Sequence, residues 1–313
     1  VDNIYFVGNS GGAIDPFLGF GQLNSIEMGV MAARSIAEGD DYERLLKRVT
    51  KHNYQLYQMR KAFNTASNET YDFIKKNYAE RIEQLTIDEV RFGVLLTAVR
   101  LSDGSHGAAS TMPDIQHHCL RKNRDFSDFT PTNVVGHRVT ALFETEKKSG
   151  LIDTLRIAVL NAISSTIIAN GNYKIVEDAD PIDLIDLNSE KTITIVGAFN
   201  SYIHRISSTK NKLYVLELNR DALVDEFKKY YVPAENYGEV IPQSDIVIIT
   251  GLTLVNSTID GLLAAIGPHT QVVVTGPSSS LIPDILFRNK VNIIGASRVY
   301  NPERLFTIVS EYG

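Results

Sequence analysis

The chain has 313 residues, of which 43% are hydrophobic and 22% are charged, and its formal net charge is −6. This composition is typical of a globular protein with two or three domains and excludes collagen, coiled coil or disorder as the main architecture. A general nucleic-acid-binding surface is not expected at this charge, and no apolar run approaches the length of a membrane span. The single cysteine excludes disulfide frameworks and multi-cysteine metal sites within the chain, and favours a reducing, cytoplasmic location.

Residues 1–67 predict a short strand at 4–8, a glycine-rich turn at 8–21 and helices at 23–37 and 42–63. The chain begins with Val1 inside an apolar strand and lacks the pattern of a signal peptide. We therefore expect this part to be the end of a longer unit. Helix 23–37 would expose an apolar face in such a fragment, which favours either self-association, as in a homodimer, or packing against the second part of the chain.

Residues 68–169 predict an α+β domain. Helices are expected at 69–85, 135–147 and 151–167, around a hairpin with strands at 90–101 and 106–111. The polar stretch 113–133 contains His117, His118 and Cys119, a compact group of side chains that soft metals prefer. Because adjacent side chains diverge, the group is a metal site on one interpretation and a polar loop on the other.

Residues 170–313 alternate between apolar strands and helical segments. Strands are expected at 192–199, 212–218, 245–251, 271–277 and 291–296, and helices near 200–207, 221–230, 256–266, 280–287 and 302–311. Nearly continuous apolar runs are typical of strands buried on both faces of a parallel sheet. The predicted fold class is α/β, with a doubly wound Rossmann-like parallel sheet at the C-terminus, preceded by the α+β domain.

Four loops follow the carboxyl ends of the predicted strands, where ligands bind in open α/β sheets. Their polar groups suit a phosphate, a carboxylate or a similar anion, although Ser, Thr and Asn are also ordinary helix caps. The candidate ligand-binding residues in these loops are Gly197, Phe199, Glu217, Thr250, Gly251, Thr253, Asn256, Thr258, Gly276, Pro277 and Ser278.

Three of the candidate residues allow more than one interpretation. Glu217 lies 20 residues after Gly197, the usual distance to a ribose-binding acid, but VGAFNS has a single glycine. Glu217 is therefore a ribose ligand, a contact to another ligand or metal, or a solvated strand end. Asn161, on an apolar helix, either holds the domain interface or reaches an interdomain cleft, because a buried amide needs partners. Thr97 is a candidate for the opposite side of that cleft.

The first 65 residues resemble the C-terminal, FAD-contacting segment of geranylgeranyl-reductase-like flavin oxidoreductases. The resemblance lies in Gly8-Asn9-Ser10-Gly11-Gly12, Asp15-Pro16, Gly19-Phe20-Gly21 and Gly29. It implies flavin contacts at Gly8, Asn9, Gly12, Pro16, Gly19 and Gly21, where glycines let the backbone approach a pyrophosphate. The family usually has an acidic residue at the position of Asn9. Its GxGxxG unit and substrate domain are absent here, so FAD is not expected to bind.

Residues from about 69 to 313 resemble the putative heavy-metal chelation family, whose members join an enolase-N-terminal-like domain to a Rossmann-like domain. The matching pieces include Thr97-Ala98-Val99, Leu160-Asn161-Ala162, Val196-Gly197-Ala198-Phe199, residues 250–258 and Gly276-Pro277-Ser278. The chain is accordingly divided into an FAD-oxidoreductase-like segment (1–67), an enolase-N-terminal-like domain (68–169) and a Rossmann-like domain (170–313). The resemblance implies a site in the cleft between the last two.

The leading hypothesis is a metal-handling protein that binds a heavy or transition metal, or a metal-chelating small molecule, in this cleft. One alternative is an enzyme that acts on a small anionic metabolite at the edge of the Rossmann-like sheet. Another is a fragment of an FAD-dependent oxidoreductase. The sequence contains no P-loop and no recognisable nucleophile–base pair, so spacing defines no catalytic residue.

Overall fold

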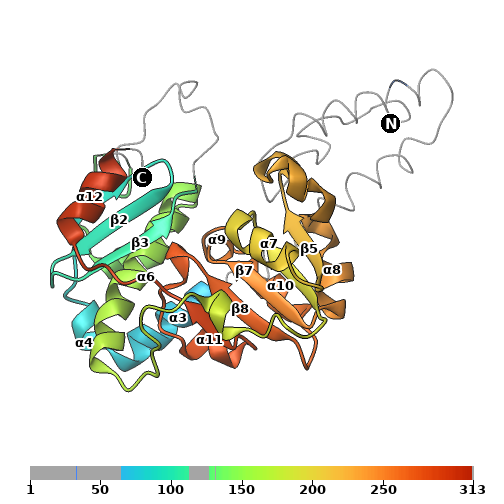
Figure 1. Cartoon of the computed structure of the whole chain (residues 1–313). Helices are drawn as coiled ribbons and strands as arrows, with labels where there is room; N and C mark the ends of the chain where they lie inside the picture. The colour runs from blue at the N-terminus through green and yellow to red at the C-terminus, as the bar shows by residue number, and fades with distance from the viewer. Residues whose placement is uncertain (1–32, 34–64, 113–126, 131, 312–313) are drawn as a thin grey trace, which may run out of the picture. The chain divides into compact units, whose positions relative to one another are not determined.

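The computed structural model describes residues 65–112, 127–130 and 132–311, together with Ala33 (Figure 1). The chain separates into two units, Val1–Asn64 and Thr65–Gly313. The architecture below is that of the second unit. The strand, glycine turn and helices expected before residue 64 lie outside the described residues.

An antiparallel sheet of three strands forms the first half of this unit. In the sheet order β1-β2-β3, its strands are β1 (Ile87–Phe92), β2 (Leu96–Leu101) and β3 (His106–Ser110). The helices of this half are α3 (Thr65–Asn77), α4 (Ala79–Ile82), α5 (Val139–Glu144) and α6 (Gly150–Asn170). One strand was expected at 90–101, where the structure has two strands and a turn. The apolar run hides this turn because Val94 and Leu95, at its tip, are hydrophobic but exposed.

Helix α6 is the core helix of the first half. Ser149 caps its N-terminus, where Ser149 Oγ accepts a hydrogen bond of 3.2 Å from Ile152 N. The helix lies so close to β3 that a Cβ added to Gly107 would be 2.2 Å from Ala158 O. Helix α6 is long and apolar enough to cross a membrane, but 67% of its apolar window is buried inside the protein. This burial is typical of a core helix.

The antiparallel sheet is covered on its other face by the last helix of the chain, α12 (Pro302–Ser310) (Figure 1). Successive residues of β2 face opposite sides, so Val99 joins the core with α6, whereas Ala98 packs with Phe306 and Val309. The chain therefore returns to its first sheet after it has completed the second one.

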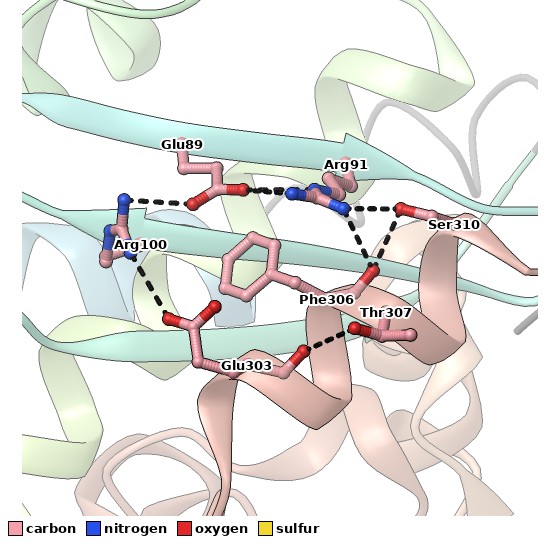
Figure 2. A network of polar contacts seen from close by, with 7 residues as sticks. All are labelled: Glu89, Arg91, Arg100, Glu303, Phe306, Thr307 and Ser310. Carbon is pink, nitrogen blue, oxygen red and sulfur yellow. Dashed lines mark hydrogen bonds and ion pairs between the residues drawn. The ribbon is translucent and has the colours of Figure 1, made fainter.

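A polar network lies between α12 and the strands β1 and β2 (Figure 2). Glu89 pairs with Arg91 at 2.8 Å and with Arg100 at 2.9 Å. Arg91 also donates to Ser310 Oγ at 2.7 Å, and its guanidinium lies 5.5 Å from the ring centroid of Phe306. Partly exposed ion pairs contribute about 1 kcal/mol or less each, so the burial of Phe306 is the main source of the docking energy.

A parallel sheet of six strands forms the second half. Its strands are β4 (Thr192–Val196), β5 (Lys212–Glu217), β6 (Tyr231–Pro233), β7 (Ile246–Thr250), β8 (Gln271–Thr275) and β9 (Ile293–Gly295). The sheet order is β6-β5-β4-β7-β8-β9. The chain adds β5 and β6 on one side of β4 and then β7, β8 and β9 on the other side, so the order of addition reverses between β4 and β7. This is the Rossmann order, and it confirms the predicted fold class.

Short helices connect these strands. They are α7 (Asn200–Ser207), α8 (Tyr237–Val240), α9 (Leu252–Val255), α10 (Ile259–Ala264) and α11 (Asp284–Arg288). The helix expected at 221–230 consists instead of 3₁₀ turns. Val247 and Val274, on one face of the sheet, belong to the same hydrophobic core as α6, whereas Ile248 and Val273 face a separate core with α7. The two halves thus share one core.

Candidate functional site

The loops after β4, β7 and β8 meet at the carboxyl edge of the parallel sheet. Gly197 has φ +105°, a region that favours glycine, and a Cβ there would lie 3.1 Å from the Thr250 methyl carbon. Gly251 N donates to Thr275 O at 2.8 Å. A Cβ on Gly251 would lie 3.0 Å from Ser279 N. The structure therefore brings three of the four predicted loops together at the switch point of the sheet.

Hydroxyl groups in the loop after β7 bond within the protein. Thr253 Oγ1 donates to Thr250 O at 2.6 Å, and Thr258 Oγ1 pairs with Asn256 Oδ1 at 2.7 Å. Both Thr253 and Thr258 are buried. These hydroxyls shape the loop, and an anion could recruit them only if the loop rearranged.

Glu217 and Phe199 have local partners. Glu217 Oε1 accepts hydrogen bonds from Leu218 N at 2.7 Å and Asn219 N at 3.1 Å, a geometry that favours the strand-end interpretation. The ring of Phe199 stacks on Tyr202 with centroids 5.5 Å apart. Burial, and then the carboxylate of Asp180, raise the pKa of Tyr202, whose hydroxyl donates to that carboxylate.

The 3₁₀ turn η8 (Pro277–Ser279) and the residues after it connect the two halves. Ser110 N donates to Ser278 Oγ at 2.9 Å, and Ile282 N donates to Ser164 Oγ at 3.0 Å. Both serine side chains are fully buried. We call this contact the joint. Its residues are Ala108 and Ser110 of β3, Asn161 and Ser164 of α6, and Pro277, Ser278 and Ile282 of the loop after β8.

Asn161 lies at the centre of the joint. Its Nδ2 donates to Ala108 O at 2.7 Å and to Pro277 O at 3.1 Å, so it bonds to both halves. The residue is only 2% exposed, and its Oδ1 is buried without a hydrogen-bond partner among the described residues. Asn200 Oδ1, in the first residue of α7, is also buried and unpaired. Asn161 therefore bonds the two halves to each other through its Nδ2 group.

Thr97 of β2 pairs with Ala109 of β3, which lies between the joint residues Ala108 and Ser110. Thr97 Oγ1 pairs with Thr111 Oγ1 at 2.9 Å on the antiparallel sheet. Sequence reasoning did not single out Asn200, although it directly follows the loop VGAF, and nothing local marked Ser110 or Ser164. The other candidates lie outside the described residues. They are Gly8, Asn9, Gly12, Pro16, Gly19, Gly21, His117, His118 and Cys119. Among residues 65–112, 127–130 and 132–311, no group of three or more His, Cys, Asp and Glu side chains could hold a metal.

The fold and joint define a two-part α/β protein in which the half with the antiparallel sheet packs against the half with the Rossmann-like sheet through β3, α6 and the loop after β8. Two family models match this unit, DUF4213 over residues 75–164 and DUF364 over residues 180–313, and both are described as "Putative heavy-metal chelation". The chain belongs to this family, which confirms the resemblance noted from the sequence. Residues 1–65 precede both matched ranges.

Solved structures of the same family share the fold. A DUF364 protein of unknown function from Pyrococcus horikoshii is 20% identical, with a TM-score of 0.63 over 80% of this chain and 93% of that one. A DUF364 protein of unknown function from Desulfitobacterium hafniense is also 20% identical, with a TM-score of 0.60 over 77% and 90% of the two chains. No curated protein matches the chain.

Proposed function

We propose that this protein handles a heavy or transition metal by binding it, as a complex with a small chelating ligand, at the joint. Both matched family models carry the same metal-chelation description, and their ranges lie on opposite sides of the joint. A ligand held there would contact both ranges at once. The joint also adjoins the loop after β8, at the edge where open α/β sheets bind ligands.

The unpaired oxygen of Asn161 is the observation that carries this proposal. A buried polar atom without a partner costs about 1–3 kcal/mol. Such atoms are rare in folded proteins, and a bound water, ion or ligand is their usual explanation. Because the serine hydroxyls of the joint already accept hydrogen bonds, the Asn161 oxygen is where an added group gains most.

The chelating ligand, rather than the joint, would supply most of the metal's own ligands. Soft and borderline metals prefer thiolate and imidazole groups, whereas the joint offers amides, hydroxyls and backbone atoms. His117, His118 and Cys119 remain the candidate protein ligands of the metal. The protein would thus recognise the complex through its organic part.

Access to the site would require a local movement. Asn161 Oδ1 is shielded from solvent, so a ligand reaches it only after a local rearrangement of the residues around it. A conformational step of this kind slows association below the usual protein on-rates of about 10⁵–10⁷ M⁻¹s⁻¹. Slow binding is therefore expected.

Thermal stability of the full chain tests the proposal, after purification without chelators and measurement of the metal content by mass spectrometry. The ligands are Ni²⁺, Ni²⁺–iminodiacetate and inorganic phosphate. We expect the nickel chelate to stabilise the protein, by about 2.7 kcal/mol at 100 times its Kd. Stabilisation by phosphate alone would favour the alternative, an enzyme for a small anionic metabolite. If no nickel species stabilises the protein, the proposal is wrong.

Two variants locate the effect at the joint. Asn161→Leu removes the unpaired oxygen, whereas Thr154→Ala removes a hydrogen bond outside the joint from the same buried helix. We expect the nickel chelate to stabilise Thr154→Ala but not Asn161→Leu. An equal response of both variants would show that the ligand binds elsewhere.

A further inference from the structure

The unpaired group of Asn161 is an acceptor, and its orientation is determined by the joint. Asn161 Nδ2 faces the carbonyl oxygens of Ala108 and Pro277, which can only accept hydrogen bonds. A reversed amide would place Oδ1 against two carbonyl oxygens and would lose both bonds. Asn161 Oδ1 can therefore be satisfied only by a hydrogen-bond donor or a cation.

Two hydroxyl donors in the neighbouring loops already bond within the protein. Thr253 Oγ1 donates to Thr250 O, and Ser279 Oγ lies 2.6 Å from Gly276 O. Asn200 Oδ1, at the start of α7, is a second buried and unpaired oxygen of the same kind. The side-chain atoms that lack any partner at this edge of the described structure are thus these two amide oxygens. A ligand made only of anionic oxygens would leave them unsatisfied.

An N–H group fits the Asn161 oxygen better than a heavy metal ion does. Soft and borderline metals prefer nitrogen and sulfur to a single amide oxygen. A nitrogen bound to a metal donates strongly through its remaining N–H, because the nearby cation draws charge from the bond. A chelate with such a nitrogen would satisfy the oxygen and keep the metal on its own ligands.

Resting on the proposed function, we infer that the ligand of the joint presents an N–H group to Asn161 Oδ1. The protein then selects amine-bearing chelates over chelates that lack an N–H and over the free metal ion. Asn161 determines specificity through the organic part of the ligand and does not coordinate the metal.

A pair of nickel chelates tests this inference by calorimetric titration of the full chain. Ni²⁺–iminodiacetate and Ni²⁺–N-methyliminodiacetate have the same charge and the same coordinating atoms, but the second has a methyl group in place of the N–H hydrogen. We expect the protein to bind the N–H chelate about tenfold more tightly, because the methyl group leaves the buried oxygen unpaired. Free Ni²⁺ should bind more weakly than the N–H chelate.

The two α6 variants separate a hydrogen bond from a steric effect. The preference should disappear in Asn161→Leu and persist in Thr154→Ala. A preference that persisted in Asn161→Leu would reflect the bulk of the methyl group and would overturn the inference. Equal binding of both chelates to the unmodified protein, which requires no variant to fold, would overturn it and leave the proposed function intact. If neither chelate nor Ni²⁺ binds, the proposed function itself fails.

Discussion

Gly107 of β3 lies against the backbone of α6, and replacing it with alanine should force the two elements apart. The new Cβ would be 2.2 Å from Ala158 O and 2.4 Å from Ala162 N. Carbon and carbonyl oxygen atoms normally approach to about 3.3–3.6 Å, so the helix must withdraw by about 1 Å. A gap of about 0.5–1 Å already loses a quarter to a half of the dispersion energy of the separated atoms.

The expected loss of stability for Gly107→Ala is about 3 kcal/mol or more. Overpacked substitutions typically cost about 1–3 kcal/mol. This substitution belongs at the upper end because both clashes are with backbone atoms, which no side-chain rotation relieves. The measurement is urea unfolding of the full chain, monitored by circular dichroism. The dependence of the unfolding free energy on urea concentration should be the same in the variant and the unmodified protein, which shows that both undergo the same transition.

Gly238→Ala is the matched control. Gly238 lies in α8, and no atom is within 4 Å of an added Cβ. Alanine should be neutral there or stabilise the protein by up to about 1 kcal/mol, because it is the better helix former. If the free energy of unfolding of Gly107→Ala lies within about 0.5 kcal/mol of that of the unmodified protein, the close approach of α6 to β3 is not a constraint on the fold.

Three further perturbations test α12 and the joint. Phe306→Ala should destabilise the docking of α12 by about 3 kcal/mol and speed hydrogen exchange in that helix, because Phe306 is the main buried contact. Burial of His106 beside Phe306, and then the charge of Arg100, lower the pKa of His106. The stability that neutral His106 contributes is therefore fully present above about pH 6.5, and it is lost as the pH falls through the lower pKa of the folded state. Urea unfolding midpoints measured at pH 7.5 and pH 5 test this loss. Ser278→Ala leaves Ser110 N–H without its acceptor and should lower the thermal midpoint by an amount equivalent to about 1 kcal/mol.

Each of these results has a control on the same element. Ile308→Ala, at an exposed position of α12, should leave hydrogen exchange in that helix unchanged. If Phe306→Ala changed hydrogen exchange no more than Ile308→Ala does, the packing described above would be contradicted. The urea midpoints of His106→Gln at pH 7.5 and pH 5 should differ less than those of the unmodified protein. An unchanged difference would assign the pH effect to other groups. A thermal midpoint unaffected by Ser278→Ala would show that the joint does not depend on that bond.

Local sequence was sufficient for the parallel sheet because each of its central strands is buried on both faces. Burial on both faces requires an uninterrupted apolar run, such as TITIV in β4 or QVVVT in β8, and such runs are visible without knowledge of their neighbours. The same rule failed at the hairpin before Leu96, where exposed apolar residues at a turn continue the pattern of the strands. Strand β6 was missed because its three residues are too few to show any pattern.

The sequence by itself determined the fold class, the family and the loops that meet at the edge of the parallel sheet. Tertiary structure alone decided what those loops can do. Sequence marks Asn161 as an amide on an apolar helix, but its bonds go to Ala108 and Pro277, which are 53 and 116 residues away. The packing of α12 on the first sheet is equally remote from its sequence neighbours. Hydrogen bonds across such distances depend on how whole elements pack, so the free oxygen at the joint was visible only in the folded chain.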